Sequence, residues 1–220
     1  MKNYKTQFLS LALEYGALRF GEFELKSGRI SPYFFNAGLF NTGHAAAGLG
    51  QCYAAALSNI DIKFDMLFGP AYKGISLVTL AAATLAENYG IDYPFAYNRK
   101  EAKDHGEGGT NIGADITGRV LILDDVITAG TAATQAVDII HAEGAQPAGI
   151  LVALDREEIG RKGQLSAVQE LQNRIGVPVQ SIVSLSDLIN HLESNGELAK
   201  FLPAVRKYRN RYGATSDESA

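Results

Sequence analysis

The stretch VLILDDVITAGT at residues 120–131 joins an apolar run, two adjacent carboxylates and a short Thr/Gly loop. A brief, partly β-branched apolar run between turn signals is typical of a buried strand in a parallel sheet, so we expect a strand at 120–123. Asp124 and Asp125 then stand at its carboxyl end. Ligands of open α/β sheets bind outside that end of the strands. The segment therefore predicts both a fold class and the place of a site.

The residues after the acidic pair predict a phosphate site at the start of a helix. Gly130 permits close approach of the backbone, and Thr128 and Thr131 add hydroxyl groups beside the N–H groups of a helix expected at 131–143. That helix has one apolar face, and Gly144 is placed to end it. The acids offer acceptors for sugar hydroxyls, and the loop offers donors for a phosphate. Together they indicate a ribose 5-phosphate pocket.

Other interpretations of an acidic pair fit less well. A carboxylate that ends a strand is often only the cap of the next helix. A Walker-type site requires GxxxxGK[ST], but Leu49 follows the spaced glycines Gly43 and Gly48 where lysine is needed. A receiver-type phosphoacceptor site would not explain the TAGT loop, and the sequence has no GxGxxG dinucleotide fingerprint.

Composition narrows the class of protein. With 220 residues, 46% of them hydrophobic, the chain suits one core with at most a small extension. A formal net charge of −4 argues against a nucleic-acid partner held by a general basic field. The single Cys52 and four scattered histidines predict neither an internal disulfide nor a protein-built metal site. The N-terminus has an amphipathic pattern rather than an apolar leader, so we expect a cytoplasmic protein.

The order of the expected elements predicts an α/β fold with a parallel sheet flanked by helices. The expected core strands are at 64–68, 93–97, 120–123, 149–154 and 179–183. The expected helices are at 3–15, 45–58, 75–88, 131–143, 185–192 and 197–212.

A small N-terminal unit, called the hood below, precedes this core within roughly residues 1–40. Two short strands at 20–25 and 33–37, joined by the turn KSGRISP, form a hairpin flap in it. We expect residues 1–213 to be a single domain that includes the hood. Residues 214–220 form a polar tail with nothing to bury, which we expect to be disordered.

Four segments, in order along the chain, carry a resemblance to a known family. DDVITAGTA from Asp124 resembles the phosphoribosyl diphosphate signature of the type I phosphoribosyltransferases. LKSGRISPYFFNAG from Leu25, FGPAYKG from Phe68 and NRKEAKDHGEGG from Asn98 narrow the likeness to the orotate phosphoribosyltransferases. The resemblance implies that family's fold, a parallel Rossmann-like sheet flanked by helices with an N-terminal hood. It also implies transfer of the phosphoribosyl group from phosphoribosyl diphosphate to orotate, which gives orotidine 5′-monophosphate and diphosphate in UMP biosynthesis.

The motifs predict how phosphoribosyl diphosphate is held. The acidic pair should accept hydrogen bonds from the ribose hydroxyls and suits a ring that becomes cationic. The TAGT loop should bind the 5′-phosphate, and a side chain at Gly130 would enter the ligand. The residues expected to contact this substrate are Lys26, Tyr72, Lys73, Arg99, Lys100, Lys103, His105, Asp124, Asp125, Val126, Ile127, Thr128, Ala129, Gly130, Thr131 and Ala132.

FGPAYKG is the expected second phosphate element. Its loop amides and Lys73 can meet the diphosphate, while Gly69 and Gly74 allow a tight turn. The resemblance implies a cis peptide between Ala71 and Tyr72. In isolation this motif would be a surface turn with an incidental lysine, but the TAGT loop favours the phosphate interpretation.

The cationic stretch that follows residue 98 predicts a lid. Its cations are Arg99, Lys100, Lys103 and His105, and glycines follow at 106, 108 and 109. A charge run is usually a solvated surface, but a glycine-rich cationic loop suits closure over diphosphate. The resemblance implies that this loop is shared across a two-fold homodimer, and that Mg²⁺ arrives on the substrate diphosphate rather than in a protein cluster. The residues assigned to catalysis are Lys103, His105, Asp124 and Asp125.

Orotate carries a carboxylate on a flat ring, so its pocket needs a fixed cation and apolar walls. Arg156 can supply a bidentate fork, or it is only a surface partner of Glu157 or Glu158. Because neighbouring strand residues point to opposite faces, one of Phe34 and Phe35 should belong to the core. The residues expected to contact orotate are Lys26, Phe34, Phe35, Thr128 and Arg156.

Two other functions stay open at this point. A phosphoribosyltransferase for another nucleobase would share the phosphate elements, although a neutral base does not need Arg156. A non-catalytic regulator that senses phosphoribosyl diphosphate would normally carry a nucleic-acid-binding module or a basic face, and it would not require the cationic lid.

Overall fold

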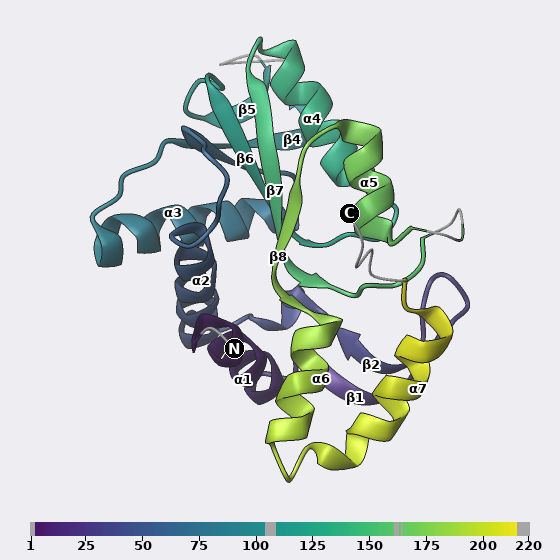
Figure 1. Ribbon diagram of the computed structural model, residues 1–220. Helices are drawn as coiled ribbons and strands as arrows, with labels where there is room; N and C mark the ends of the chain where they lie inside the picture. The colour runs from purple at the N-terminus through teal and green to yellow at the C-terminus, as the bar shows by residue number, and fades with distance from the viewer. Residues whose placement is uncertain (1–2, 104–108, 161–162, 164, 215–220) are drawn as a thin grey trace.

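A six-stranded sheet sets the plan of the molecule (Figure 1). The computed structural model describes residues 3–103, 109–160, 163 and 165–214, and its central strands run in the order β5-β4-β3-β6-β7-β8. These strands are β3 (Met66–Gly69), β4 (Phe95–Lys103), β5 (Gly109–Gly113), β6 (Arg119–Val126), β7 (Gln146–Asp155) and β8 (Val179–Ser184). Neighbouring strands are parallel except β4 and β5, which pair antiparallel. The predicted parallel α/β sheet is confirmed, with an antiparallel strand added at one edge.

Helices cover both faces of this sheet. They are α2 (Gly43–Leu57), α3 (Lys73–Tyr89), α4 (Thr131–Ala142) and α5 (Ala167–Ile175). Figure 1 shows α2 and α3 on one side of the strands and α4 and α5 on the other. Buried side chains of α2 and α3 belong to one apolar cluster, and those of α4 and α5 belong to a second.

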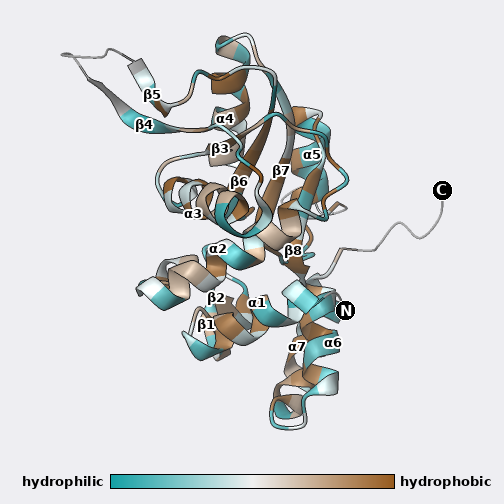
Figure 2. Ribbon diagram, turned by 90° about the vertical axis from the view of Figure 1, so that its left-hand side faces the viewer, coloured by the Kyte–Doolittle hydropathy of each residue, from teal (hydrophilic) through white to brown (hydrophobic). Residues whose placement is uncertain are grey.

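Strand β6 packs against both clusters. Leu121 and Leu123 contribute to the cluster that contains α2 and α3, whereas Val120 and Ile122 contribute to the other. All four side chains are fully buried, because alternate residues of a strand point to opposite faces and both faces are covered. The ribbon of β6 is accordingly strongly hydrophobic in Figure 2. The apolar run before the acidic pair is therefore the buried strand that the sequence predicts.

The hood lies at the carboxyl ends of the central strands (Figure 1). It contains α1 (Asn3–Glu14), the antiparallel hairpin of β1 (Leu18–Glu24) and β2 (Ile30–Phe35), and the short 3₁₀ helix η1 (Ala37–Leu39). Helices α6 (Leu185–Ser194) and α7 (Leu202–Tyr212) from the C-terminal part pack on it. The rings of Phe20 and Phe201 stack at 4.4 Å, and Lys5 pairs with Asp187 at 2.7 Å. Segments from the N-terminal and C-terminal parts of the chain thus build the layer that faces the carboxyl ends of the central strands.

Some elements differ from the sequence expectations. Helix α5 was not expected, although Ser166 and Gln169 form a capping box at its start. Strand β5 was not expected either. The single helix expected at 197–212 is a 3₁₀ turn, η2 (Ala199–Phe201), followed by α7, whose first turn contains Pro203. Proline lacks an N–H group and fits only the first turn of a helix, which fixes this break.

Among the described residues, no helix combines the length and the apolar character needed to cross a membrane.

Candidate functional site

The acidic pair stands where β6 extends beyond its neighbour β3. Pairing between β3 and β6 ends at Phe68 with Ile122, whereas pairing between β6 and β7 continues as far as Val126 with Leu154. Asp124 and Asp125 therefore occupy the carboxyl end of β6 after β3 has turned away. This is the position in which the sequence analysis expects them.

A lysine from the segment that follows β3 contacts the acidic pair. Lys73, the first residue of α3, places its Nζ atom 2.5 Å from Oδ2 of Asp125, and the Asp125 side chain is only 9% exposed. Asp124 turns its Oδ1 atom to accept a hydrogen bond from the backbone N–H of Asp125 at 2.9 Å. Both carboxylates thus have fixed orientations. The Lys73 contact also joins the two segments that the sequence assigns to separate phosphate elements.

The electrostatics of Asp124 are unusual. Burial raises the pKa of its carboxyl to about 7, and the nearby charge of Asp125 adds to the shift. Hydrogen bonding from Asp125 and the charge of Lys73 act in the opposite direction. A negative charge at Asp124 is therefore costly until a partner such as a sugar hydroxyl, or a cationic ring, meets it.

The TAGT loop leads into an uncapped helix. Gly130 is the N-cap of α4 in a left-handed conformation (φ 70°), and no side chain caps the first turn. Thr128, Ala129 and Thr131 are exposed. The first N–H groups of α4 have no intrahelical partner, and together with the helix dipole they can bind an anion. That a phosphate binds here stays a prediction.

The expected effect of a side chain at Gly130 is wrong in its direction. A Cβ atom there would lie 2.5 Å from Nη2 of Arg174 and 2.9 Å from Cδ1 of Leu171, both on α5. Nη2 of Arg174 also donates to the carbonyl of Ala129 at 3.2 Å. The glycine is required because α5 packs against the loop from behind, so a substitution would displace the loop rather than enter a ligand.

The FGPAYKG loop makes the tight turn expected of it. A Cβ atom on Gly69 would come within 2.1 Å of the carbonyl oxygen of Gly74, so neither position tolerates a side chain. The Ala71–Tyr72 peptide is cis, as the resemblance implies. The backbone N–H of Ala71 donates to Oδ1 of Asn98 at 2.9 Å, which ties the loop to β4.

The cationic stretch is partly a strand rather than the loop expected. Arg99 and Lys100 lie within β4, and β4 and β5 project from the body as a two-stranded arm (Figure 2). Nζ of Lys100 lies 4.7 Å from the ring centroid of the exposed Tyr72, so this arm contacts the FGPAYKG loop. Lys103 is the last residue of β4. Its side chain and the whole of His105 lie outside the described residues.

Arg156 lies in a network that links β7 to the hood. Its guanidinium pairs with Oε1 of Glu158 at 2.6 Å, and its Nη2 atom donates to the hydroxyl of Ser31 at 3.1 Å. The guanidinium carbon stands 4.3 Å from the ring centroid of Tyr33. Glu158 in turn accepts a hydrogen bond from the hydroxyl of Tyr208 at 2.9 Å. Arg156 therefore has the acidic partner that the alternative interpretation names, yet it is held at the hood and not on an open surface.

The other residues expected at orotate divide between core and surface. Phe35 is buried, with its ring centroid 5.9 Å from that of Phe8, so the prediction that one of the two phenylalanines belongs to the core is confirmed. Phe34 is half-buried against Phe23. Lys26 is exposed in the turn between β1 and β2.

Sequence reasoning missed two residues that fix this region. Tyr53 on α2 donates from its hydroxyl to the carbonyl of Asp124 at 2.7 Å, and Asn98 holds the FGPAYKG loop. Asn98 stands beside Arg99, which the sequence predicts as a site residue. Tyr53 lies 71 positions from its partner, and no local pattern connects the two.

The donor set suits a metal that arrives with a ligand. In the part of the chain that the structure describes, no group of three or more His, Cys, Asp or Glu side chains could hold a metal ion. Asp124 and Asp125 offer carboxylate oxygens, one of which is already paired with Lys73. Magnesium commonly binds one or two carboxylates together with substrate phosphates and waters, and two carboxylates beside two phosphate loops fit that pattern.

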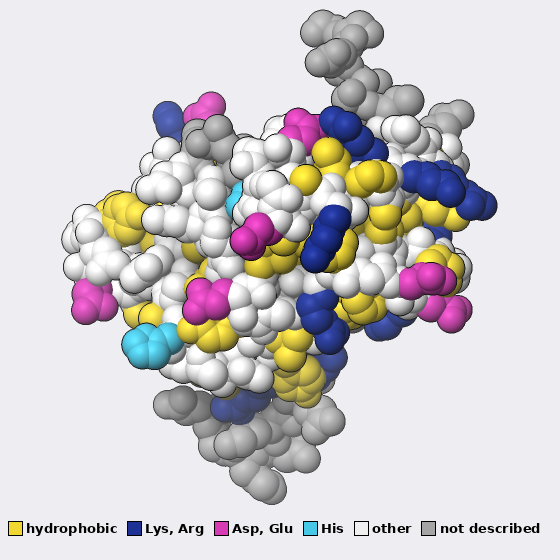
Figure 3. All heavy atoms as spheres, turned by 90° about the horizontal axis from the view of Figure 1, so that it is seen from below, with side chains coloured by type: hydrophobic (Ala, Val, Ile, Leu, Met, Phe, Trp, Pro, Cys, Tyr) yellow, Lys and Arg dark blue, Asp and Glu magenta, His cyan; other side chains and the backbone are white. Residues whose placement is uncertain are grey.

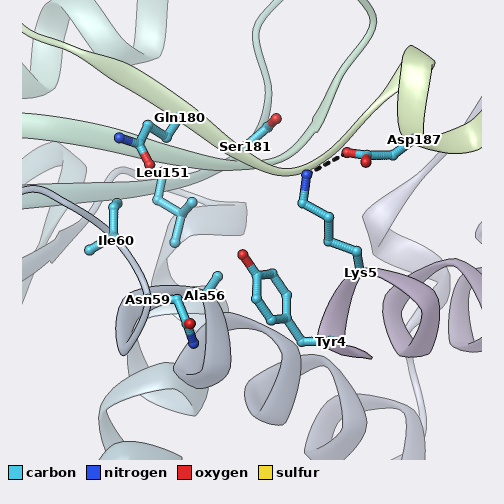
Figure 4. Close-up of a pocket in the computed structure, with 9 residues that line it drawn as sticks. All are labelled: Tyr4, Lys5, Ala56, Asn59, Ile60, Leu151, Gln180, Ser181 and Asp187. Atoms are coloured by element: carbon cyan, nitrogen blue, oxygen red, sulfur yellow. Dashed lines mark hydrogen bonds and ion pairs between the residues drawn. The ribbon is translucent and has the colours of Figure 1, made fainter. Parts of the chain in front are cut away.

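Two surface hollows lie apart from the acidic pair, and no predicted site residue lines either of them. The first, of about 310 Å³, is shown in Figure 4, where the ion pair of Lys5 and Asp187 closes one side. Its lining residues are Tyr4, Lys5, Ala56, Asn59, Ile60, Leu151, Gln180, Ser181 and Asp187. The second, of about 710 Å³, is a groove between the β1–β2 hairpin and α7. On the described surface seen from below, basic side chains are mixed with acidic and hydrophobic ones (Figure 3).

Known proteins resemble this chain over most of its length. A family model described as "Phosphoribosyl transferase domain" matches residues 41–168. The orotate phosphoribosyltransferase of Thioalkalivibrio sulfidiphilus is 59% identical over 213 residues, which cover 97% of this chain and 100% of that protein. That of Vibrio vulnificus is 58% identical with the same coverage. The crystal structure of orotate phosphoribosyltransferase from Francisella tularensis is 41% identical with a TM-score of 0.85, over 94% of this chain and 99% of that one.

Proposed function

The chain belongs to the phosphoribosyltransferase family, and within it to the orotate phosphoribosyltransferases, so we propose that it transfers the phosphoribosyl group from phosphoribosyl diphosphate to orotate. The products are orotidine 5′-monophosphate and diphosphate, and the step belongs to pyrimidine biosynthesis. One observation carries the proposal at the level of the site. The contact of Lys73 with Asp125 brings the FGPAYKG loop, the acidic pair and the TAGT loop to one place.

The chemistry requires charge stabilisation more than proton transfer. Breaking the bond between C1 and the diphosphate oxygen leaves positive charge on the ribose and negative charge on diphosphate. Asp124 and Asp125 hold the 2′ and 3′ hydroxyls and face the cationic ring with negative charge. The backbone N–H groups at the start of α4 hold the 5′-phosphate, which fixes C1 relative to the base.

The leaving diphosphate is met by cations from two segments. Lys73 and the amides of the FGPAYKG loop approach it from the end of β3, and the cationic stretch that begins in β4 supplies Arg99, Lys100, Lys103 and His105. Mg²⁺ bound to the diphosphate neutralises further charge there when it is present. Lys103 and His105 are assigned to catalysis because charge on diphosphate grows as the bond breaks, so cations placed there act most strongly in the transition state.

Orotate is recognised through its carboxylate by Arg156. The guanidinium is held by Glu158, Ser31 and the ring of Tyr33. A preoriented arginine loses little freedom when it binds a carboxylate. Lys26, Phe34 and Thr128 complete the pocket around the base.

The arm serves a second subunit in this proposal. β4 and β5 project away from the body that carries their own acidic pair (Figure 2), which favours use of the arm across a two-fold homodimer. Residues 1–213 act as one domain, in which the hood and the sheet enclose the reacting groups.

A single-turnover assay with a panel of bases tests the proposed function. Purified protein is mixed with Mg²⁺, phosphoribosyl diphosphate and either orotate, uracil, adenine or hypoxanthine, and nucleotide formation is followed by rapid quench. We expect orotidine 5′-monophosphate from orotate and little product from the other bases. Faster turnover of a neutral base would indicate a transferase for that base. Binding of phosphoribosyl diphosphate without any turnover would indicate a sensor.

A further inference from the structure

Tyr53 connects a buried helix to the first acid of the pair. It is one of the largest fully buried side chains, and its hydroxyl donates to the backbone carbonyl of Asp124 at 2.7 Å. The residue belongs to α2, which follows the hood in sequence and packs against α3. None of the motifs that mark the ribose and phosphate elements contains it.

The geometry of β6 explains why this carbonyl needs a donor. β3 pairs with β6 only as far as Ile122, so beyond that residue no strand of the described chain pairs with that side of β6. A buried carbonyl without a donor is costly. The Tyr53 hydroxyl supplies a hydrogen bond where the sheet no longer does, and the strand can continue to the acidic pair in an extended conformation.

The remaining contacts of the pair do not fix its backbone on that side. Lys73 holds the carboxylate of Asp125, and the carboxylate of Asp124 accepts from the N–H of Asp125. Both contacts orient the side chains of Asp124 and Asp125. The position of their main chain must be fixed by other contacts. Pairing with β7 does so from one side, and Tyr53 does so from the other.

We infer that Tyr53 is a positioning residue for the ribose: its hydroxyl holds the main chain of Asp124 so that both carboxylates meet the 2′ and 3′ hydroxyls. The inference rests on the proposed function, because it assigns the ribose to the acidic pair. Burial and the charges of Asp125 and Asp124 keep the pKa of Tyr53 well above its usual value, so the phenol stays a donor at every pH at which the protein works.

Tyr53→Phe tests this role because it deletes one oxygen atom and keeps the ring in the core. Two probes separate the parts of the site in binding titrations. Ribose 5-phosphate meets the acids and the TAGT loop, whereas inorganic diphosphate with Mg²⁺ meets the FGPAYKG loop, whose backbone at Ala71 is held by Asn98. We expect ribose 5-phosphate to bind about tenfold more weakly, as for the loss of one well-placed hydrogen bond, with diphosphate affinity unchanged. In steady-state assays the KM for phosphoribosyl diphosphate should rise while the KM for orotate stays constant.

Ser58→Ala is the matched control. It deletes another hydroxyl at the end of the same helix, one that donates to the carbonyl of Ala54 at 2.9 Å, away from the acidic pair. We expect it to leave both probe affinities unchanged, and melting temperatures of the two variants should show that each is folded.

Four results would count against the inference. If the Tyr53→Phe protein binds ribose 5-phosphate as tightly as the parent, the hydroxyl does not position the acids. If both probes weaken equally, or if Ser58→Ala has the same effect, the role of Tyr53 is general stability and the inference is overturned. Failure of the parent protein itself to bind ribose 5-phosphate would instead contradict the assignment of the ribose to the acidic pair, and the inference with it, whereas the proposed function is overturned only if the parent forms no orotidine 5′-monophosphate in the single-turnover assay.

Discussion

Arg156 is engaged on one edge by Glu158 and stacked on Tyr33, with its side chain only 15% exposed. Burial lowers the pKa of an arginine, but the charge of Glu158 and the phenol of Tyr33 outweigh it, so Arg156 remains a cation. Its partner Glu158 also contacts Arg29 on the hood at 3.4 Å. One carboxylate between two guanidinium groups leaves net positive charge, which suits an anionic base.

Replacing Arg156 by Leu should chiefly damage the use of orotate. Loss of a charge-assisted fork costs about 1.5–3 kcal/mol, so we expect kcat/KM for orotate to fall roughly 10- to 150-fold, with the KM for phosphoribosyl diphosphate within about twofold of the parent. Steady-state kinetics with each substrate varied in turn measure both. Arg119→Leu, which breaks an exposed pair with Asp65, is the control and should change neither. Unchanged orotate kinetics together with lost phosphoribosyl diphosphate binding would show that the two pockets are assigned the wrong way round.

Ionisation of the Asp124 carboxyl should make the unliganded protein less stable as pH rises. Its pKa is raised to about 7 in the folded state, against about 3.9 in an unfolded chain, so between these values the folded protein binds the proton more tightly. The contribution of Asp124 to the free energy of unfolding therefore falls from about pH 4 to about pH 7. We expect Asp124→Asn to remove this fall, so that its melting temperature relative to the parent is higher at pH 8 than at pH 4. The variant should also bind ribose 5-phosphate more weakly.

Asp65→Asn provides the contrast. Hydrogen bonds from Arg119 lower the pKa of Asp65 to about 2, so its stabilising contribution is present at neutral pH and is lost in acid. Melting curves across pH should therefore show opposite signs for the two substitutions. If Asp124→Asn gives the same difference from the parent at every pH, then Asp124 ionises normally.

At the scale of elements, the sequence predicted what local patterns encode. β6 and α4 each carry their own signal, an apolar run before two acids and an amphipathic period closed by Gly144. α4 was located within one residue, whereas β6 begins one residue before and ends three residues after the expected strand. β5 (GTNIG) has no alternation of apolar and polar residues, and it exists because it pairs with β4. Helix α5 had a readable capping box at Ser166 that the sequence analysis did not use.

The site divides in the same way. Asp124, Asp125 and Lys73 stand in contiguous motifs, and the structure brings these motifs together through the contact of Lys73 with Asp125. The contact from Tyr53 arises only when α2 packs beneath β6, so no pattern in either segment could reveal it. Contacts between distant segments depend on packing that a single sequence does not display.

The two ends of α4 allow a matched test of the phosphate loop. Gly130 and Gly144 both have positive φ, 70° and 76°, but a Cβ atom at 130 would collide with α5 whereas one at 144 would meet nothing within 4 Å. We expect Gly144→Ala to cost about 1–2 kcal/mol in the free energy of unfolding from backbone strain alone. Gly130→Ala should cost more and should also weaken ribose 5-phosphate binding. Chemical denaturation and binding titration measure the two effects, and equal losses of stability would mean that α5 does not constrain the loop.

At the scale of the whole molecule, the site is built on the central sheet, with the hood and the arm placed around it. The acidic pair and both phosphate loops stand at the carboxyl ends of β3 and β6, the hood covers that mouth, and the arm of β4 and β5 extends away from it (Figure 2). Arg156 connects the end of β7 to the hood through Ser31. In the proposed function the base and the sugar phosphate are held by separate elements, which meet at the carboxyl ends of the sheet strands.

Mixing two inactive variants tests whether the arm serves a partner. Lys103→Ala removes a cation of the arm, and Asp125→Asn alters the acidic pair. If the arm completes the site of the other subunit, each hybrid dimer contains one intact site, so a mixture that exchanges subunits freely should regain about a quarter of parental activity. A mixture that stays inactive after verified subunit exchange would mean that each arm serves its own subunit.

The assignment of the pentose to the acidic pair and the TAGT loop is tested most directly by a crystal structure with ribose 5-phosphate bound. We expect the 2′ and 3′ hydroxyl oxygens within hydrogen-bonding distance, about 2.5–3.0 Å, of carboxylate oxygens of Asp124 and Asp125, with the phosphate on the N–H groups of residues 128–131. A sugar phosphate bound elsewhere, with the TAGT loop empty and the carboxylates facing solvent, would contradict the assignment.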